Sequence, residues 1–332
     1  MTQAAPLTEI WRGPLAESVH TGHAVICDAG GDIIEAWGDP ETVVLPRSSS
    51  KMLQALPLVE SGAAAAHGLT PAHLALACAS HGGAPIHTGP VAEWTAALGL
   101  SEADFRCGAH MPTDEAALHA LIREGRIPCQ LHNTCSGKHA GFLTLTKHLG
   151  AGPEYNAPDH PVQTACRAAF EEVTGAPSPG YGIDGCSAPN FMTRLHPMAH
   201  AMARFAAATD GAGVRASAMA RLREAMMRHP ELVAGEGRAC TLLMQACTEP
   251  VALKTGAEGF YIAILPARKT GIALKITDGA TRAAECTIAA LLVRLGALDA
   301  DHPAARKFLN APITNANGLV TGAIRPAAGL LR

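Results

Sequence analysis

Segments with the alternating pattern of β-strands lie near both ends of the chain, and this arrangement constrains the fold most. The predicted strands are residues 23–27, 32–37, 258–265 and 271–277. The first two are joined by Asp28-Ala29-Gly30-Gly31, whose glycines supply the positive φ angles of a hairpin turn. The other two flank a turn at 266–270, and a helix is predicted at 280–295. We therefore expect an α+β fold whose antiparallel sheet is assembled from N- and C-terminal segments.

Helical periodicity dominates the middle of the chain. A helix is predicted to begin around Ser49–Lys51 and to be bent or ended by Pro57. Further helical segments are expected at residues 73–78, 90–99, 114–124, 139–149, 160–174 and 191–228. The last is interrupted at Asp210–Gly213, and its methionines fit core filling. We expect one unit over 1–332 with two lobes, a sheet lobe at about 10–60 and 250–332 and a largely helical lobe at about 61–249.

Composition excludes several classes of protein. Of the 332 residues, 48% are hydrophobic and 17% are charged, which is typical of a globular chain with a large core. The formal net charge of −3 and the lack of a basic run argue against nucleic acid or an anionic membrane as partner. No signal peptide is evident, and the ten cysteines are scattered through apolar segments. We expect a cytoplasmic protein in which at least seven of these thiols are reduced and buried.

The first candidate for chemistry is Ser48 with Lys51. A serine at a helix start with a lysine one turn later places the amine and the hydroxyl on one face. A neutral lysine can serve as the base that a serine nucleophile needs. At an ordinary pKa, about one lysine in 10³ is neutral at pH 7.5, which corresponds to ~4 kcal/mol. The alternative is a helix-capping serine beside a surface lysine.

A second motif strengthens the catalytic interpretation. Lys254-Thr255-Gly256 stands just before a predicted strand, and lysine is scarce, at seven of 26 basic residues. An SxxK motif near the N-terminus and a KTG motif on a late strand resemble those of the serine penicillin-recognising enzymes. The Ser-Asp-Asn element of that class is absent from the sequence, so an ordinary β-lactamase is not expected.

Two small-residue turns contain cysteine. Cys135-Ser136-Gly137-Lys138 is not a phosphate loop, because His132 and His139 replace the required glycine and hydroxyl residue. The second turn, Gly182–Pro189, contains Asp184 and Cys186. Two thiolates with a further nitrogen or oxygen donor could bind zinc, although buried reduced thiols remain an alternative.

Five ordered segments together resemble the motifs of the Rhizobium etli-type L-asparaginases. These are Arg47–Lys51, Ala79–Gly83, Asn133–Gly141, Gly182–Pro189 and Lys254–Gly259. The resemblance spans about residues 10–330, and the chain length is similar to that of the thermostable constitutive form in this family. It implies a serine β-lactamase/glutaminase-like catalytic unit, a homodimer and L-asparagine as the small-molecule substrate.

The resemblance also implies roles for individual residues. Ser48–Lys51 and Ser80–Lys254 match two serine–lysine tandems, and Cys135, Lys138 and Cys186 match a zinc site. Asp184 matches a residue that positions the substrate or a zinc-bound water. Beside these matches, Arg47 is a candidate substrate-binding or supporting residue. His81 is a candidate ligand or proton shuttle, although a satisfied structural histidine is the competing interpretation. Asn133 either contacts the substrate or caps the following helix.

These features lead to a primary hypothesis and two alternatives. The primary hypothesis is hydrolysis of L-asparagine to L-aspartate and ammonia through an aspartyl-enzyme on Ser48. The first alternative is a related serine hydrolase that acts on glutamine, β-lactams or esters. The second is a zinc-stabilised protein that binds amino acids without turning them over.

Overall fold

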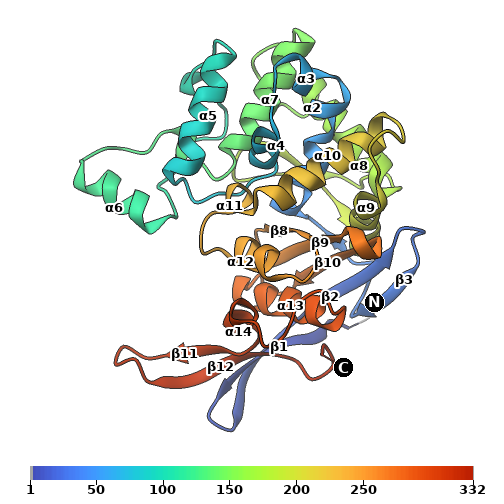
Figure 1. Ribbon diagram of the computed structural model, residues 1–332, viewed down its shortest axis with the longest axis vertical. Helices are drawn as coiled ribbons and strands as arrows, with labels where there is room; N and C mark the ends of the chain where they lie inside the picture. The colour runs from blue at the N-terminus through green and yellow to red at the C-terminus, as the bar shows by residue number, and fades with distance from the viewer. Residues whose placement is uncertain (1–2, 332) are drawn as a thin grey trace. The chain divides into compact units, whose positions relative to one another are not determined.

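A computed structural model describes residues 3–331, and the chain divides into two compact units (Figure 1). The first comprises Met1–Ser49, Thr193–Ala207 and Leu242–Arg332, and the second comprises Ser50–Met192 and Ala208–Thr241. The first unit therefore draws on three stretches of sequence. The boundary between Ser49 and Ser50 falls inside the Ser48–Lys51 motif.

The first unit is built on an eight-stranded sheet with the order β11-β12-β1-β2-β10-β9-β8, and β3 also pairs with β2. All of these pairs are antiparallel. The strands are β1 (Ala5–Arg12), β2 (Leu15–Asp28), β3 (Ile33–Trp37), β8 (Ala252–Gly256), β9 (Phe260–Leu265), β10 (Thr270–Ile276), β11 (Ala311–Thr314) and β12 (Val320–Pro326). The predicted fold class, α+β with an antiparallel sheet from N- and C-terminal segments, is confirmed.

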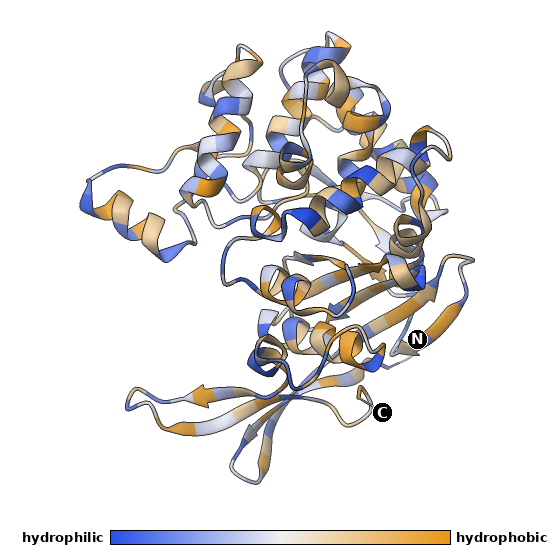
Figure 2. Ribbon diagram, in the orientation of Figure 1, coloured by the Kyte–Doolittle hydropathy of each residue, from blue (hydrophilic) through white to orange (hydrophobic). Residues whose placement is uncertain are grey.

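Helices cover both faces of this sheet. Every residue of β9 is buried, so neither face of that strand meets solvent. Figure 2 colours the ribbon by hydropathy, and the strands of this sheet contain many hydrophobic residues. The helix α9 (Leu195–Ala207) packs on β2, β9 and β10, while α13 (Thr281–Arg294) packs on β1, β9, β10 and β12. The approach of α9 depends on Gly271, where an added Cβ would lie 2.3 Å from the Ala199 carbonyl oxygen.

The rest of the first unit is small. The helix α14 (Pro303–Leu309) packs on α13, and the short strands β4 (Val43–Val44) and β7 (Thr193–Arg194) pair with each other. One 3₁₀ turn, η4 (Pro266–Arg268), connects β9 to β10, and another, η1 (Arg47–Ser50), runs across the boundary between the units.

The second unit is mainly helical. Its helices are α1 (Lys51–Gln54), α2 (Leu56–Glu60), α3 (Ala63–Ala66), α4 (Pro71–Ala77), α5 (Pro85–Ala97), α6 (Glu115–Arg123), α7 (Ser136–Leu149), α8 (Pro161–Thr174), α10 (Val214–Arg228) and α11 (Pro230–Val233). The 3₁₀ turns η2 (Glu102–Asp104) and η3 (Gln130–His132) and the hairpin of β5 (Tyr181–Ile183) and β6 (Pro189–Phe191) complete it, and α12 (Ala239–Ala246) crosses the boundary.

The centre of the second unit is α7. Its residues from Ser136 to Thr146 are all buried, and α2, α3, α4, α5 and α8 pack against it. Gly137 permits the close approach of α4, because a Cβ there would lie 2.3 Å from the Leu76 carbonyl oxygen. Ser136, Lys138 and His139, in the first turn of this helix, are therefore held in the interior of the unit.

Several predicted elements have different bounds in the structure. The N-terminal hairpin is confirmed, but its first strand begins at Leu15. The helix predicted after Ser49 is a short α1, and Pro57 lies in the first turn of α2, where its missing N–H costs no helical hydrogen bond. Lys254-Thr255-Gly256 forms the end of β8 and precedes β9, so the expectation of a KTG motif on a late strand is confirmed. The break at Asp210–Gly213 is confirmed, between α9 and α10.

Two further expectations from composition can be compared with the structure. All ten cysteines are free thiols and eight of them are buried, which confirms the prediction for at least seven. Within residues 3–331, no helix is both long and apolar enough to cross a membrane.

Candidate active site

In the first unit, the Arg47–Ser49 part of the predicted Arg47–Lys51 motif contacts the end of β8. The Ser49 hydroxyl donates to the Lys254 carbonyl oxygen at 2.9 Å. At Gly256 an added Cβ would lie 2.6 Å from the Pro46 carbonyl oxygen and 3.0 Å from Ser49 Oγ, so only glycine fits there. Arg47 has a φ of 50°, a left-handed conformation that costs a non-glycine residue ~1–3 kcal/mol and is common at functional sites.

Two side chains of this first-unit cluster differ in exposure. Ser48 is partly exposed, whereas Lys254 is fully buried. The Lys254 ammonium donates to the Thr255 carbonyl oxygen at 2.7 Å. A buried amine with a polar partner is an unusual feature of a sheet core, because an isolated buried charge is costly.

The second unit brings Lys51 and Ser80 together. Lys51 is 1% exposed, and its Nζ donates to the Ala79 carbonyl oxygen and, at 2.9 Å, to Ser80 Oγ. The sequence predicts Ser48 as the partner of Lys51 and Lys254 as the partner of Ser80. Each predicted tandem joins residues from different units, and both tandems stay predictions. The hydrogen bond between Lys51 and Ser80 was not predicted.

The backbone around Ser80 is fixed by its neighbours. The Ser80 N–H donates to the Val233 carbonyl oxygen at 2.8 Å, and the His81 N–H donates to that of Thr134 at 3.2 Å. The His81 ring accepts from the Gly83 N–H at Nδ1, so its Nε2 donates to Ser136 Oγ at 2.9 Å. Both ring nitrogens therefore have structural partners, which favours the structural interpretation of His81 over a proton shuttle.

Cys135, Lys138 and Cys186 form a buried cluster in the second unit. Lys138 Nζ donates to Cys186 Sγ at 3.0 Å. A hydrogen bond from Cys135 holds the pKa of Cys186 well below its usual range, with the Lys138 charge acting in the same direction against burial. The same hydrogen bond, with burial, raises the pKa of Cys135 to about 11. The three side chains are thus electrostatically coupled within the interior of the second unit.

The fit of this cluster to zinc is partial. The two sulfur donors, which share a hydrogen bond, suit a borderline metal ion, but the third donor, the Lys138 amine, must first lose a proton. Charges of Cys186, Cys135 and Asp184 outweigh burial and raise the pKa of Lys138. Among residues 3–331, no group of three or more His, Cys, Asp or Glu side chains is arranged so that it could hold a metal ion. The structure therefore does not support a zinc site made of the usual donors.

Asn133 and Asp184 lie beside this cluster. The Asn133 amide donates to the carbonyl oxygens of Cys107 and Gly108 at 2.8 and 2.9 Å, and its Oδ1 accepts from the Cys135 N–H at 2.9 Å. Asn133 thus holds the loop before α7, whose N-cap residue is Cys135 without a side-chain cap hydrogen bond, so helix capping by Asn133 is not borne out. Asp184 stands in the β5–β6 turn, where its Oδ1 accepts from the Gly185 N–H at 2.9 Å.

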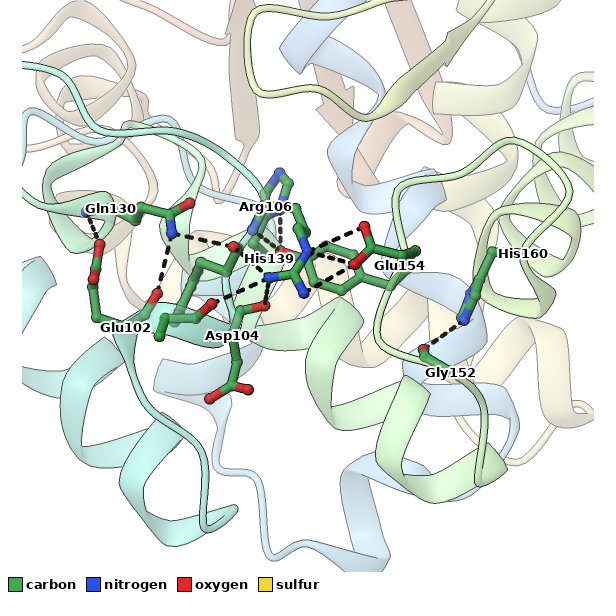
Figure 3. Close-up of polar contacts among 11 residues, drawn as sticks. Glu102, Asp104, Arg106, Gln130, His139, Gly152, Glu154 and His160 are labelled. Carbon is green, nitrogen blue, oxygen red and sulfur yellow. Dashed lines mark hydrogen bonds and ion pairs between the residues drawn. The ribbon is translucent and has the colours of Figure 1, made fainter.

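The sequence does not reveal the contact between Tyr155 and His139. The Arg106 N–H donates to Tyr155 Oη at 2.7 Å, and the Tyr155 hydroxyl is 2.8 Å from His139 Nδ1. Since the phenol oxygen accepts from Arg106, its own proton is available to His139. The Arg106 side chain also pairs with Glu154, the residue before Tyr155 in the sequence; Figure 3 shows the pair of Arg106 and Glu154. His139 Nε2 is buried without a hydrogen-bond partner in the described part of the chain.

Comparison with known proteins places the chain in a family. The sequence profile of the L-asparaginase II family matches residues 8–326, and the chain belongs to this family. It is therefore an asparaginase-type amidohydrolase that acts on a small-molecule substrate. No curated protein sequence gave a match.

Solved structures give weaker likenesses. A β-lactamase from Mycobacterium bovis has a TM-score of 0.46 and 12% identity, over 82% of this chain and 94% of that one. A protein described as Mglu in its native form has a TM-score of 0.46 and 16% identity, over 84% and 66%. An octameric penicillin-binding protein homologue from Pyrococcus abyssi has a TM-score of 0.36 and 12% identity, over 87% and 75%.

Proposed function

We propose that the protein hydrolyses L-asparagine to L-aspartate and ammonia with a serine nucleophile activated by lysine. The observation that carries this proposal is the buried Lys51 amine in contact with Ser80 Oγ, in a member of the L-asparaginase II family. A buried lysine can act as the base of a serine nucleophile, and its hydrogen bond to Ser80 Oγ connects Lys51 to the proton relay described next.

The proposed reaction has two stages. Ser48 Oγ attacks the side-chain amide carbon, and its proton passes to the Lys51 amine. The C–N bond then breaks, ammonia leaves with a proton returned by lysine, and the aspartyl group remains on Ser48. Water hydrolyses this ester, which releases L-aspartate and restores the serine hydroxyl. Ser80 Oγ and Lys254 relay protons, a role that fits the hydrogen bond between Ser80 and Lys51.

The cysteine cluster has a supporting role in this proposal. If zinc binds, Cys135, Lys138 and Cys186 would hold it. The ion would then act as a Lewis acid that polarises or orients the substrate. Asp184 and Arg47 would then position the polar groups of the amino acid. We further propose a cytoplasmic homodimer of the Rhizobium etli type; light scattering tests the dimer, and the temperature dependence of inactivation tests whether this is the thermostable form.

A substrate comparison separates this function from its nearest alternative. We expect kcat/KM for L-asparagine to exceed that for L-glutamine and nitrocefin by orders of magnitude. A preference for glutamine or nitrocefin would instead favour the related serine hydrolase. Binding of asparagine without ammonia release would favour an amino-acid-binding protein. Ser18→Ala is a suitable control for serine variants, because Ser18 is exposed on β2.

A further inference from the structure

A cavity of about 510 Å³ lies within the second unit, apart from the Lys51–Ser80 pair. Three segments line it, at residues 82–87, 113–116 and 234–238. Ser80 is not among the lining residues, and its hydroxyl contacts Lys51. Gly82, two positions further along, does line the cavity. The reaction proposed above makes no use of this space.

Hydrogen bonds between backbone segments hold the walls in place. The Gly82 carbonyl oxygen accepts from the N–H groups of Thr113 and Asp114 at 2.9 and 3.0 Å. On the opposite segment, the Gly235 carbonyl oxygen accepts from Thr241 Oγ1 at 2.6 Å. Gly235 has a φ of 117°, which disfavours any larger residue. The cavity is therefore formed before any ligand binds.

The segments that line the cavity come close to one another at Gly235. A Cβ added there would lie 3.6 Å from Arg238 Cγ, 3.7 Å from His87 Cε1 and 3.9 Å from the Gly82 nitrogen. Asp114 adjoins the same place, because a Cβ on Gly82 would lie 3.2 Å from the Asp114 Cβ. A ligand of a few heavy atoms could therefore reach several polar groups at once.

The lining carries charges of both signs. Arg238 supplies a guanidinium group, and carboxylates come from Asp114, Glu115 and Glu236. The fully buried His87 has its Nε2 3.0 Å from the Glu231 carbonyl oxygen, so Nε2 is the donor nitrogen. Burial lowers the pKa of His87, which favours the neutral ring and leaves Nδ1 as an acceptor. Within residues 3–331, this Nδ1 has no hydrogen-bond partner.

These groups select a chemical class of ligand. A carboxylate fits the fork of donors on Arg238, whereas an ammonium group fits the carboxylates and the acceptor nitrogen of His87. We propose that the cavity is a second binding site, separate from the reaction centre, for a small zwitterionic α-amino acid. The cavity lies close to the Ser80 segment, because the ring of the lining residue His87 stacks on the ring of His81, with centroids 4.7 Å apart.

Isothermal titration calorimetry with glycine tests this site, because glycine has no side-chain amide to hydrolyse. The wild type should bind glycine, and Arg238→Gln and Glu236→Gln should each weaken binding at least about tenfold, as expected for the loss of a charge-assisted hydrogen bond. Arg221→Gln is the matched control, since Arg221 is also exposed in the same unit but lines a different cavity, and it should bind as the wild type does. Acetate and ethylamine, each with one of the two charges, should bind at least about tenfold more weakly than glycine.

Activity measurements distinguish a second site from the substrate site. Arg238→Gln should leave kcat/KM for L-asparagine unchanged while it loses glycine binding. Absence of glycine binding to the wild type, unchanged binding in both cavity variants, or equal binding of acetate or ethylamine would overturn the proposal. So would a raised KM for asparagine in Arg238→Gln, because the cavity would then be the substrate site. Glycine binding does not depend on turnover, so a protein inactive on asparagine would refute the proposed function and leave this site standing.

Discussion

The contact between Tyr155 and His139 leads to a quantitative prediction for Tyr155→Phe. The substitution keeps the buried ring and removes only the hydroxyl, so it opens no large cavity. It leaves the backbone N–H of Arg106 without its acceptor at 2.7 Å, and it leaves His139 Nδ1 without its donor at 2.8 Å. An unsatisfied buried partner costs ~1–3 kcal/mol. Because the Arg106 contact is only partly buried, we expect a total loss of about 2–4 kcal/mol.

Denaturant unfolding of purified protein measures this loss. The midpoint for Tyr155→Phe should fall while the slope stays that of the wild type. Tyr181→Phe is the matched control: Tyr181 is 46% exposed in the same unit, and its variant should stay within about 0.5 kcal/mol of the wild type. If Tyr155→Phe also stayed within about 0.5 kcal/mol, the reasoning that this hydroxyl bridges two buried groups would be refuted.

Three further predictions concern the candidate active site. Gly256→Ala should reduce turnover at least about tenfold, because its Cβ would displace the Pro46–Ser49 backbone; Gly89→Ala, with open space around it, should keep wild-type kinetics. Lys51→Met should lower kcat by about 10²–10⁴-fold, the usual contribution of a general base, and a decrease below about tenfold would exclude that role. If the cysteine cluster holds zinc, elemental analysis should find metal in the wild type and little in Cys186→Ala, whereas equal contents in the two proteins would place the metal elsewhere.

The sequence predicts the fold where local chemistry decides it. The N-terminal hairpin follows from the glycine turn at Asp28–Gly31, and the break between α9 and α10 follows from glycines. The strands β11 and β12 were not predicted, because their partly exposed residues lack a strong apolar alternation. Lys254 lies on β8, just before β9, as expected for a KTG motif on a late strand, but the sequence did not give the bounds of β8.

The sequence indicates many residues of the candidate site, but it does not reveal which of them contact one another. Motifs identify Lys51, Cys135 and Cys186, because scarce lysines and small-residue turns stand out in the sequence, whereas Ser80 is indicated only by the resemblance to the asparaginase family. Spacing does not reveal that Lys51 contacts Ser80, 29 residues away, since packing of the helices brings them together. Tyr155 has no motif around it, and only the folded second unit brings its hydroxyl to His139.

The most direct test of the proposed function is the initial rate of ammonia release from L-asparagine by wild type and Ser48→Ala at equal concentrations of folded protein. We expect steady release by the wild type and a loss of several orders of magnitude in Ser48→Ala, while Ser18→Ala retains the wild-type rate. A Ser48→Ala enzyme with wild-type turnover would contradict the assignment of the nucleophile. A wild type that released no ammonia would contradict the proposed function itself.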